Sequence, residues 1–278
     1  MNNSNYIVTA ANAKFYKSFC QLAYSFNRAR EFENSTIVFY DLGLEKEQAE
    51  NIKNKNSSSF EHVTYRVFDF EKYPEFVKPN YMTWAWKPII IEELMKETGG
   101  NIFWMDSANQ ILKNLKPLWR IISEKGTYLP FAGSGQLTDW TMKATLEFVG
   151  VPSSAYKSRN RAGNTCAFSA NNKHVQALVE EWKSLCLVKE CVLPEGADRS
   201  NHRGDQSVLS SLLVSRSYAE KLNLTNDEVD ISSGSPTSFV SVRNRFPRYL
   251  PMNPGWLAFH YFNFFRFLDV LINKIKGN

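Results

Sequence analysis

A carboxylate stands directly after an apolar run in residues 102–109. Residues 102–105 are all apolar, and Asp106 follows them at once, with small polar residues behind it. In an open α/β sheet, ligands bind at the carboxyl ends of the strands. A carboxylate at such a strand end, with no basic neighbour in the sequence, suits a metal ion or a sugar hydroxyl. The structural alternative for Asp106 is a helix N-cap or a turn former, because aspartate accepts backbone N–H bonds at such positions.

A second carboxylate, Asp205, follows His202 and Arg203 and opens an apolar stretch at residues 204–214. Gln206 stands beside it, and its amide both donates and accepts hydrogen bonds. A helix N-cap is again the structural alternative for Asp205. Together with Asp106, this segment suggests an enzyme that handles a nucleotide sugar.

Two further segments have a type of residue that suits phosphate or nucleoside binding. Thr9, Ala10, Ala11 and Asn12 follow the first predicted strand, where small residues let a ligand ring approach the backbone. The Trp86-Lys87 pair opens a predicted helix, where a lysine can meet a diphosphate beside free helix N–H groups. A solvated lysine next to a core tryptophan is the equal alternative. The glycine-rich dinucleotide fingerprint and the Walker A pattern are both absent, which argues against those two classes.

His260 lies within the aromatic segment 256–262. A histidine in such surroundings is more often a core residue, although neutral imidazole is also a good metal ligand. The segment that follows, residues 262–276, combines a broad apolar face with basic residues. Packing of this helix on the domain is favoured over an interfacial position on an anionic membrane, which stays the alternative.

Composition places the chain among ordinary globular proteins. It has 278 residues, 43% hydrophobic and 22% charged, which fits one large α/β domain or two small ones. The net charge of +5 is too diffuse for nucleic-acid binding, but it suits a phosphate-bearing ligand or an anionic membrane surface. The four cysteines form no CxxC pair or zinc pattern. The first residues lack a signal-peptide core and no run reaches transmembrane length, so we expect a cytoplasmic location, with peripheral membrane contact through the tail as the alternative to its packing on the domain.

Hydrophobic periodicity predicts an open, twisted, mostly parallel sheet flanked by helices, because strands and helices alternate from the start. The predicted strands are residues 6–9, 36–40, 62–68, 102–105, 127–132 and 164–169. The predicted helices are residues 13–30, 45–55, 84–98, 115–124, 139–149, 172–187 and 204–214. Residues 133–135 are predicted as a flexible turn, and 153–161 and 195–203 as polar loops. The domain is expected to span residues 1–253, with an aromatic helical extension at 254–278.

Four motifs resemble those of nucleotide-sugar glycosyltransferases with the GT-A fold, a Rossmann-like α/β fold. They are Tyr40-Asp41-Leu42-Gly43, Trp86-Lys87-Pro88, Trp104-Met105-Asp106-Ser107 and the segment 202–207. The sequence is similar to the glycogenin-like transferases, and closer still to an uncharacterised family of glycosyltransferases from animals and viruses. The resemblance spans residues 6–213.

The resemblance implies transfer of a hexose from a UDP-sugar to a glycan acceptor, lipid-linked if the tail meets a membrane. Thr9 to Asn12 would hold the nucleoside, and Asp106 would take the first position of the D-x-D motif, which contacts ribose and Mn²⁺ or Mg²⁺. Asp205 and Gln206 would act at the sugar, and His260 would complete the metal shell. The remaining implied residues are Asp41, Trp86, Lys87 and Ser107 for the donor, and Trp140, His202 and Arg203 for the acceptor.

One departure from the family pattern bears on the reaction. The D-x-D motif reads Asp106-Ser107-Ala108, so its second carboxylate is missing, and Asn109 offers only an amide oxygen in its place. The leaving diphosphate would then need cationic side chains, for which Lys87, Arg159, Arg161 and Arg203 are the candidates. The same departure supports an alternative function, a nucleotide-sugar or glycan-binding protein without catalysis. A third hypothesis is a peripheral membrane scaffold that uses the tail.

Overall fold

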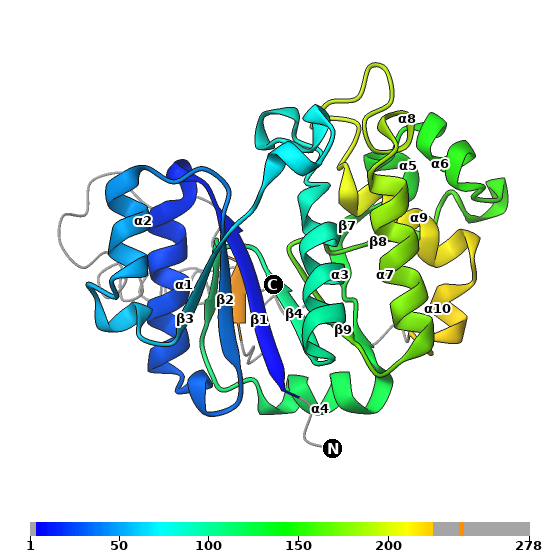
Figure 1. Cartoon of the computed structure of the whole chain (residues 1–278). Coiled ribbons are helices and arrows are strands. Elements are labelled where there is room, and N and C mark those ends of the chain that lie inside the picture. Colours follow the sequence, from blue (N-terminus) through cyan, green and yellow to red (C-terminus); the bar gives the residue numbers. More distant parts are fainter. Residues whose placement is uncertain (1–3, 225–238, 242–278) are drawn as a thin grey trace, which may run out of the picture. The chain divides into compact units, whose positions relative to one another are not determined.

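A computed structural model describes residues 4–224 and 239–241 of the chain and shows helices flanking a mixed β-sheet (Figure 1). The predicted extension 254–278, including His260, and the domain boundary at residue 253 lie outside the described residues. The six strands of the sheet are, in spatial order, β3 (Val63–Val67), β2 (Thr36–Asp41), β1 (Asn5–Ala11), β4 (Asn101–Met105), β9 (Thr165–Ser169) and β6 (Thr127–Tyr128).

The strand pairings confirm the predicted α/β class with a mostly parallel sheet. β1 and β4 are parallel, with Val8 opposite Trp104, and β2 and β3 are parallel, with Ile37 opposite Val63. β9 runs antiparallel to β4 and to β6. Every residue of β4 is buried, as expected of a strand that is covered on both faces.

The described chain forms two compact units. Among the described residues, unit 1 comprises 4–8, 68–105 and 116–224, and unit 2 comprises 9–67, 106–115 and 239–241. Unit 2 holds α1 (Tyr16–Arg28), α2 (Lys46–Lys53), and β5 (Asn109–Ile111), which pairs with β10 (Phe239–Ser241). Unit 1 holds α3 (Trp86–Thr98), α4 (Lys116–Lys125), α5 (Leu137–Trp140), α6 (Lys143–Val149), α7 (Lys173–Cys186), α8 (Lys189–Val192), α9 (Asp205–Ser215), α10 (Tyr218–Lys221) and the β7–β8 pair (Phe131–Gln136, Arg159–Arg161). Short 3₁₀ helices lie at Ala13–Phe15, Glu31–Glu33, Ser58–Phe60, Phe70–Lys72, Glu75–Val77, Pro79–Tyr81 and Ser153–Ala155.

Each unit has an aromatic core of its own. In unit 2 the buried face of α1 places the ring centre of Phe19 4.0 Å from that of Phe39, and the helix itself was predicted from hydrophobic periodicity. In unit 1 the Phe168 ring of β9 lies 5.8 Å from Trp182 of α7. All four cysteines are buried and unbridged, as expected for structural thiols. No helix in the described ranges is both long and apolar enough to cross a bilayer.

The structure corrects several predicted boundaries. The turn predicted at 133–135 lies within β7, which has a register irregularity against β8 and a left-handed Gly135. Glycines inside a strand accommodate such irregularities, and they hid the strand from the pattern. The loop predicted at 153–161 ends as β8, and the strand predicted at 127–132 is interrupted after Tyr128. The helix predicted from Trp84 begins at Trp86, because the backbone of Trp84 is left-handed.

Candidate functional site

In unit 2, the carboxyl end of β1 leaves two polar atoms unsatisfied. Thr9 is fully buried, and neither its Oγ1 nor the Oδ1 of Asn12 has a hydrogen-bond partner within the described residues. A backbone hydrogen bond connects the carboxyl ends of strands β1 and β2 here: Leu42 N donates to Ala11 O at 3.0 Å. A buried polar atom without a partner costs free energy unless a ligand or water satisfies it. The end of β1 therefore has the character of a binding site.

Asp41, at the end of β2, has its carboxylate engaged by the protein. Its Oδ1 accepts 2.7 Å hydrogen bonds from Gly43 N and Leu44 N, and the Tyr65 hydroxyl donates to its Oδ2. Burial and then the Asp41 carboxylate raise the pKa of Tyr65 well above its usual value. These contacts shape the turn after β2. The donor-binding role of Asp41 stays a prediction.

Asp106 follows β4 at the same edge of the sheet at which β1 ends, because Val8 and Trp104 are opposite each other in parallel strands. Its side chain is half-buried, and Ser107 behind it is buried. The backbone oxygen of Asp106 accepts bonds from N and Nδ2 of Asn109, both at 2.9 Å. The next element is β5, so the helix N-cap alternative for Asp106 is wrong, whereas the turn-former alternative agrees with the Asn109 N bond to Asp106 O.

A complete metal shell is not supplied by the described part of the chain. Within residues 4–224 and 239–241, no three histidine, cysteine, aspartate or glutamate side chains lie together as a metal-binding group. Asp106 is the carboxylate at the strand end, and the second ligand predicted from the sequence, His260, lies outside the described residues. One carboxylate falls short of the ligand set that Mg²⁺ or Mn²⁺ prefers.

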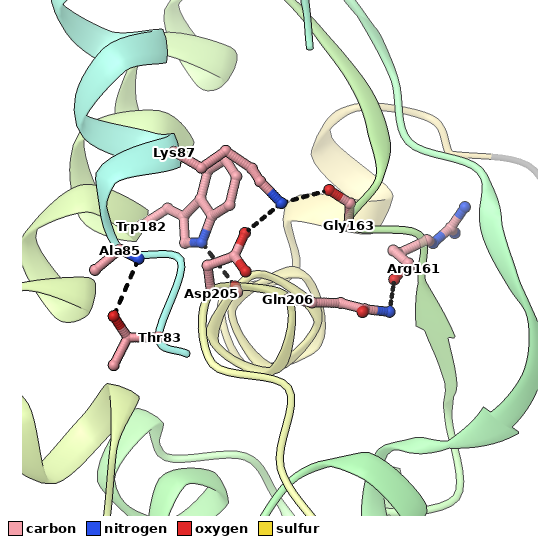
Figure 2. A network of polar contacts seen from close by, with 8 residues as sticks. All are labelled: Thr83, Ala85, Lys87, Arg161, Gly163, Trp182, Asp205 and Gln206. Carbon is pink, nitrogen blue, oxygen red and sulfur yellow. Dashed lines mark hydrogen bonds and ion pairs between the residues drawn. The ribbon is translucent and has the colours of Figure 1, made fainter. Parts of the chain in front are cut away.

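In unit 1, Lys87 and Asp205 form a buried ion pair (Figure 2). Lys87 Nζ lies 3.1 Å from Asp205 Oδ2, and the two side chains are 4% and 2% exposed. Lys87 Nζ also donates to Gly163 O at 2.6 Å, and its ammonium lies 5.5 Å from the ring centre of Trp104. The helix-start lysine is therefore held inside the protein, and the solvated alternative is wrong. Its role towards a diphosphate stays a prediction.

The backbone around Gly204 explains why α9 begins where it does. Gly204 has a left-handed φ of +49°, and a Cβ at this position would lie 2.3 Å from Thr83 O. Asp205 N donates to the same Thr83 O at 2.9 Å, and Trp182 Nε1 donates to Asp205 O at 2.8 Å. Gly204 is the N-cap, so Asp205 is the first helical residue and directs its carboxylate to Lys87. The N-cap alternative for Asp205 is therefore wrong.

Gln206 is half-exposed, in contrast to its neighbour Asp205. Its Nε2 donates to Arg161 O at 2.7 Å, as Figure 2 shows, and its side chain packs against Gly163. Arg161 is buried, donates to Leu129 O at 2.7 Å and stacks on the Phe131 ring. Gln206 therefore has an exposed surface, whereas Asp205 and Arg161 are buried.

His202, predicted at the acceptor, is buried and bonded to the backbone at both ring nitrogens. Met142 N lies 3.4 Å from Nδ1 and Val192 O lies 3.1 Å from Nε2. These partners fit a neutral ring that carries its proton on Nε2, a tautomer inferred from the hydrogen-bond network. Burial lowers the pKa of His202 to about 4, which keeps the ring neutral at physiological pH.

Trp140 and Arg203, also predicted at the acceptor, contact each other. The Arg203 guanidinium lies 4.1 Å from the centre of the Trp140 ring, and both side chains are half-exposed. A second pair of this kind, Trp84 with Arg199 at 5.9 Å, was missed by the sequence prediction. The prediction placed Trp84 inside a helix and Arg199 in a polar loop, and neither pattern indicates that the two meet.

Comparison with known proteins identifies the fold. Residues 1–92 match the model of a family of proteins of unknown function (DUF1647). No curated protein sequence matches the chain. Among solved structures, the chain is similar to the galactosyltransferase LgtC in complex with donor and acceptor sugar analogues. The TM-score is 0.54 and the identity 12%, over 93% of this chain and 94% of that one.

A second similar structure is the apo form of the bifunctional glycosyltransferase WbbM, with a TM-score of 0.53 and 12% identity. That match covers 78% of this chain and 38% of WbbM, so the chain spans well under half of that protein. At these identities the likeness concerns the fold. With the sheet order and the flanking helices already described, it shows that the chain has the GT-A fold of glycosyltransferases.

Proposed function

We propose that this protein is a glycosyltransferase that moves a hexose from a UDP-sugar to a glycan acceptor. The observation that carries the proposal is the polar character of the sheet edge in unit 2. There the end of β1 holds the unsatisfied Thr9 Oγ1 and Asn12 Oδ1, and Asp106 follows β4 at the same edge. The GT-A fold supports this function, as does the likeness to LgtC, a galactosyltransferase solved with donor and acceptor sugar analogues.

In the proposed reaction, the bond between the anomeric carbon and the diphosphate oxygen breaks as the acceptor oxygen bonds to that carbon. The acceptor proton leaves, and the nucleoside diphosphate departs with the bond's electron pair. Gln206 is proposed to face the sugar. The buried Lys87–Asp205 pair is proposed to hold Gln206 in position at the first turn of α9. Arg159 is proposed to stabilise the negative charge that develops on the leaving group.

The proposal also includes two further donor-binding residues, a divalent cation and the location of the protein. Trp86 and Ser107 are assigned to the donor, and the buried Trp86 Nε1 has no hydrogen-bond partner within the described ranges. A divalent cation held by Asp106 and His260 would supply charge stabilisation of the diphosphate. The cytoplasmic location and the membrane contact through the tail stay predictions.

The second candidate function is a nucleotide-sugar or glycan-binding protein that performs no transfer. The observation in its favour is the sequence Asp106-Ser107-Ala108, where the second carboxylate of the D-x-D motif is absent. Binding of the donor is common to both functions. Release of the nucleoside diphosphate belongs to the transferase alone, and this product separates them.

A thermal-shift screen against UDP-, GDP-, CMP- and dTDP-sugars, with and without Mn²⁺, tests the donor site. A ligand that binds the folded state raises the melting temperature by mass action. We expect one UDP-hexose to raise it for the wild type and much less for Asp106→Asn. Glu124→Gln, an exposed carboxylate of α4 that pairs with Arg120, serves as the control and keeps the shift. No shift with any nucleotide sugar would contradict the proposal.

A further inference from the structure

Two tryptophan–arginine pairs lie on either side of the Gly204–Asp205 turn in unit 1. Arg199 lies over the ring of Trp84, and Arg203 lies over the ring of Trp140, at 5.9 and 4.1 Å from the ring centres. Both indole rings are half-exposed, Arg199 is exposed and Arg203 half-exposed. The two cations come from one loop, four residues apart, so the pairs form a surface that combines exposed aromatic rings with positive charge.

Backbone contacts hold both pairs to the start of α9. Thr83, next to Trp84, accepts from Asp205 N through its backbone oxygen, close to the site that Figure 2 shows. On the other side, Ser207 Oγ donates to Trp140 O at 2.6 Å and accepts from Arg203 N at 3.0 Å. The backbones of Thr83, Trp140 and Arg203 are therefore held to the turn that also carries Gln206.

The Trp84 backbone is strained in a way that favours a ligand role. Its φ is +50°, and Met82, two residues earlier, has a φ of +56°. Left-handed backbone is uncommon for non-glycine residues and a clear outlier for bulky ones. Such strain persists only where the surrounding structure enforces it, and it concentrates at ligand-binding and catalytic positions. Here the result of the strain is a half-exposed indole beside the proposed sugar site.

The chemistry of stacked guanidinium groups indicates which ligand fits. An arginine that lies over an aromatic ring keeps its in-plane N–H donors for a planar, bidentate oxyanion. Arg199 forms no ion pair with any residue that the structure describes. The nearest acid in sequence, Asp198, has its Oδ1 engaged by N and Oγ of Ser200 at 2.6 and 2.5 Å. The indole rings add apolar faces against which a sugar ring can pack.

We propose that this surface, formed by Trp84, Arg199, Trp140 and Arg203, is an acceptor subsite for an acidic sugar residue. The sugar ring packs on the indoles, and its carboxylate or sulfate group accepts hydrogen bonds from the guanidinium groups. The inference rests on the proposed glycosyltransferase function and narrows its acceptor class. A neutral glycan can use the rings, but it offers the guanidinium groups no oxyanion.

Calorimetric titration with three tetrasaccharides tests this subsite: oligogalacturonate, a sulfated heparin fragment and neutral maltotetraose. The wild type is expected to bind at least one acidic probe tenfold or more tightly than maltotetraose, and the preferred probe distinguishes carboxylate from sulfate. Arg199→Gln is expected to weaken acidic binding about tenfold, and Arg199→Lys, which keeps the charge without the planar fork, nearly as much. Arg120→Gln, an exposed arginine of α4, is the control and leaves binding unchanged.

Several results would overturn the subsite. One is equal affinity of the wild type for maltotetraose and the acidic probes. Another is wild-type affinity for the acidic probes in Arg199→Gln. A third is a loss of affinity in Arg120→Gln as large as that in Arg199→Gln, which would indicate non-specific charge attraction. The donor thermal shift, measured on the same preparations, separates this inference from the proposed function. A donor shift without preference for acidic probes removes the subsite alone. A preference for acidic probes without any donor shift removes the transferase proposal and leaves an acidic-glycan site.

Discussion

At the scale of single residues, Lys87 and Asp205 are two predicted functional side chains that form an ion pair with each other. Both lie inside unit 1, and Lys87 has a further partner in Gly163 O. Removing two charges from water costs several kcal/mol per ion, and the close approach of the two groups offsets this cost. Removal of one partner would leave the other charge buried without compensation. In the proposed transferase, the pair would act on a bound sugar through the position of Gln206.

Replacement of Lys87 by methionine tests this dependence. Lys87→Met leaves the Asp205 carboxylate buried without its cation, so we expect a loss of roughly 3–5 kcal/mol in the free energy of unfolding. The double variant Lys87→Met/Asp205→Leu removes both charges and is expected to lose much less than the two single losses combined. Urea unfolding measures both. Lys143→Met, at an exposed pair on α6, is the control. Additive losses in the double variant would show that the pair is not coupled.

At the scale of elements, the segments with local patterns were predicted and those defined by distant partners were not. The buried face of α1 and the fully buried β4 follow from periodicity alone, and Asp106 was correctly placed at a strand end. β5 was missed and part of β7 was predicted as a turn, since short or glycine-containing strands are defined by their partners. The pairing of Lys87 with Asp205 joins residues far apart in sequence, which no local spacing reveals.

His202, in the segment before α9, is bonded to the start of α6 and the end of α8, and its burial predicts an acid-sensitive stability. The folded pKa of about 4 lies below the ordinary 6.5, so the unfolded chain takes up the proton more readily. The resulting stability is complete above pH 6.5 and is lost as the pH falls towards 4, by roughly 3 kcal/mol in all. Melting temperatures between pH 7.5 and 4.5 measure this loss.

A variant that cannot titrate provides the comparison. His202→Gln keeps hydrogen-bonding groups near Val192 O and Met142 N but removes the proton uptake, so its melting temperature should fall less between pH 7.5 and 4.5. His174→Gln, an exposed histidine of α7, should retain the wild-type pH dependence. The same slope in His202→Gln as in the wild type would mean that other groups cause the acid sensitivity.

At the scale of the whole molecule, the residues with proposed roles are distributed over both units. The residues assigned to the nucleoside and the diphosphate, Thr9 to Asn12 and Asp106, belong to unit 2. Gln206 and the aromatic–arginine surface belong to unit 1. The local sequence indicates candidate functional residues but not their roles. Carboxylates at strand ends and at helix starts have the same local pattern whether they bind ligands or hold the fold.

The most direct test of the proposed transferase is the release of UDP from UDP-hexoses by the purified chain, with an oligosaccharide acceptor and with water alone. We predict UDP release by the wild type, and a loss of about tenfold or more in Asp106→Asn with an unchanged melting temperature in the absence of ligand. A wild type that binds a UDP-hexose but releases no UDP, with or without acceptor and Mn²⁺, would contradict glycosyl transfer and identify the protein as a binding protein.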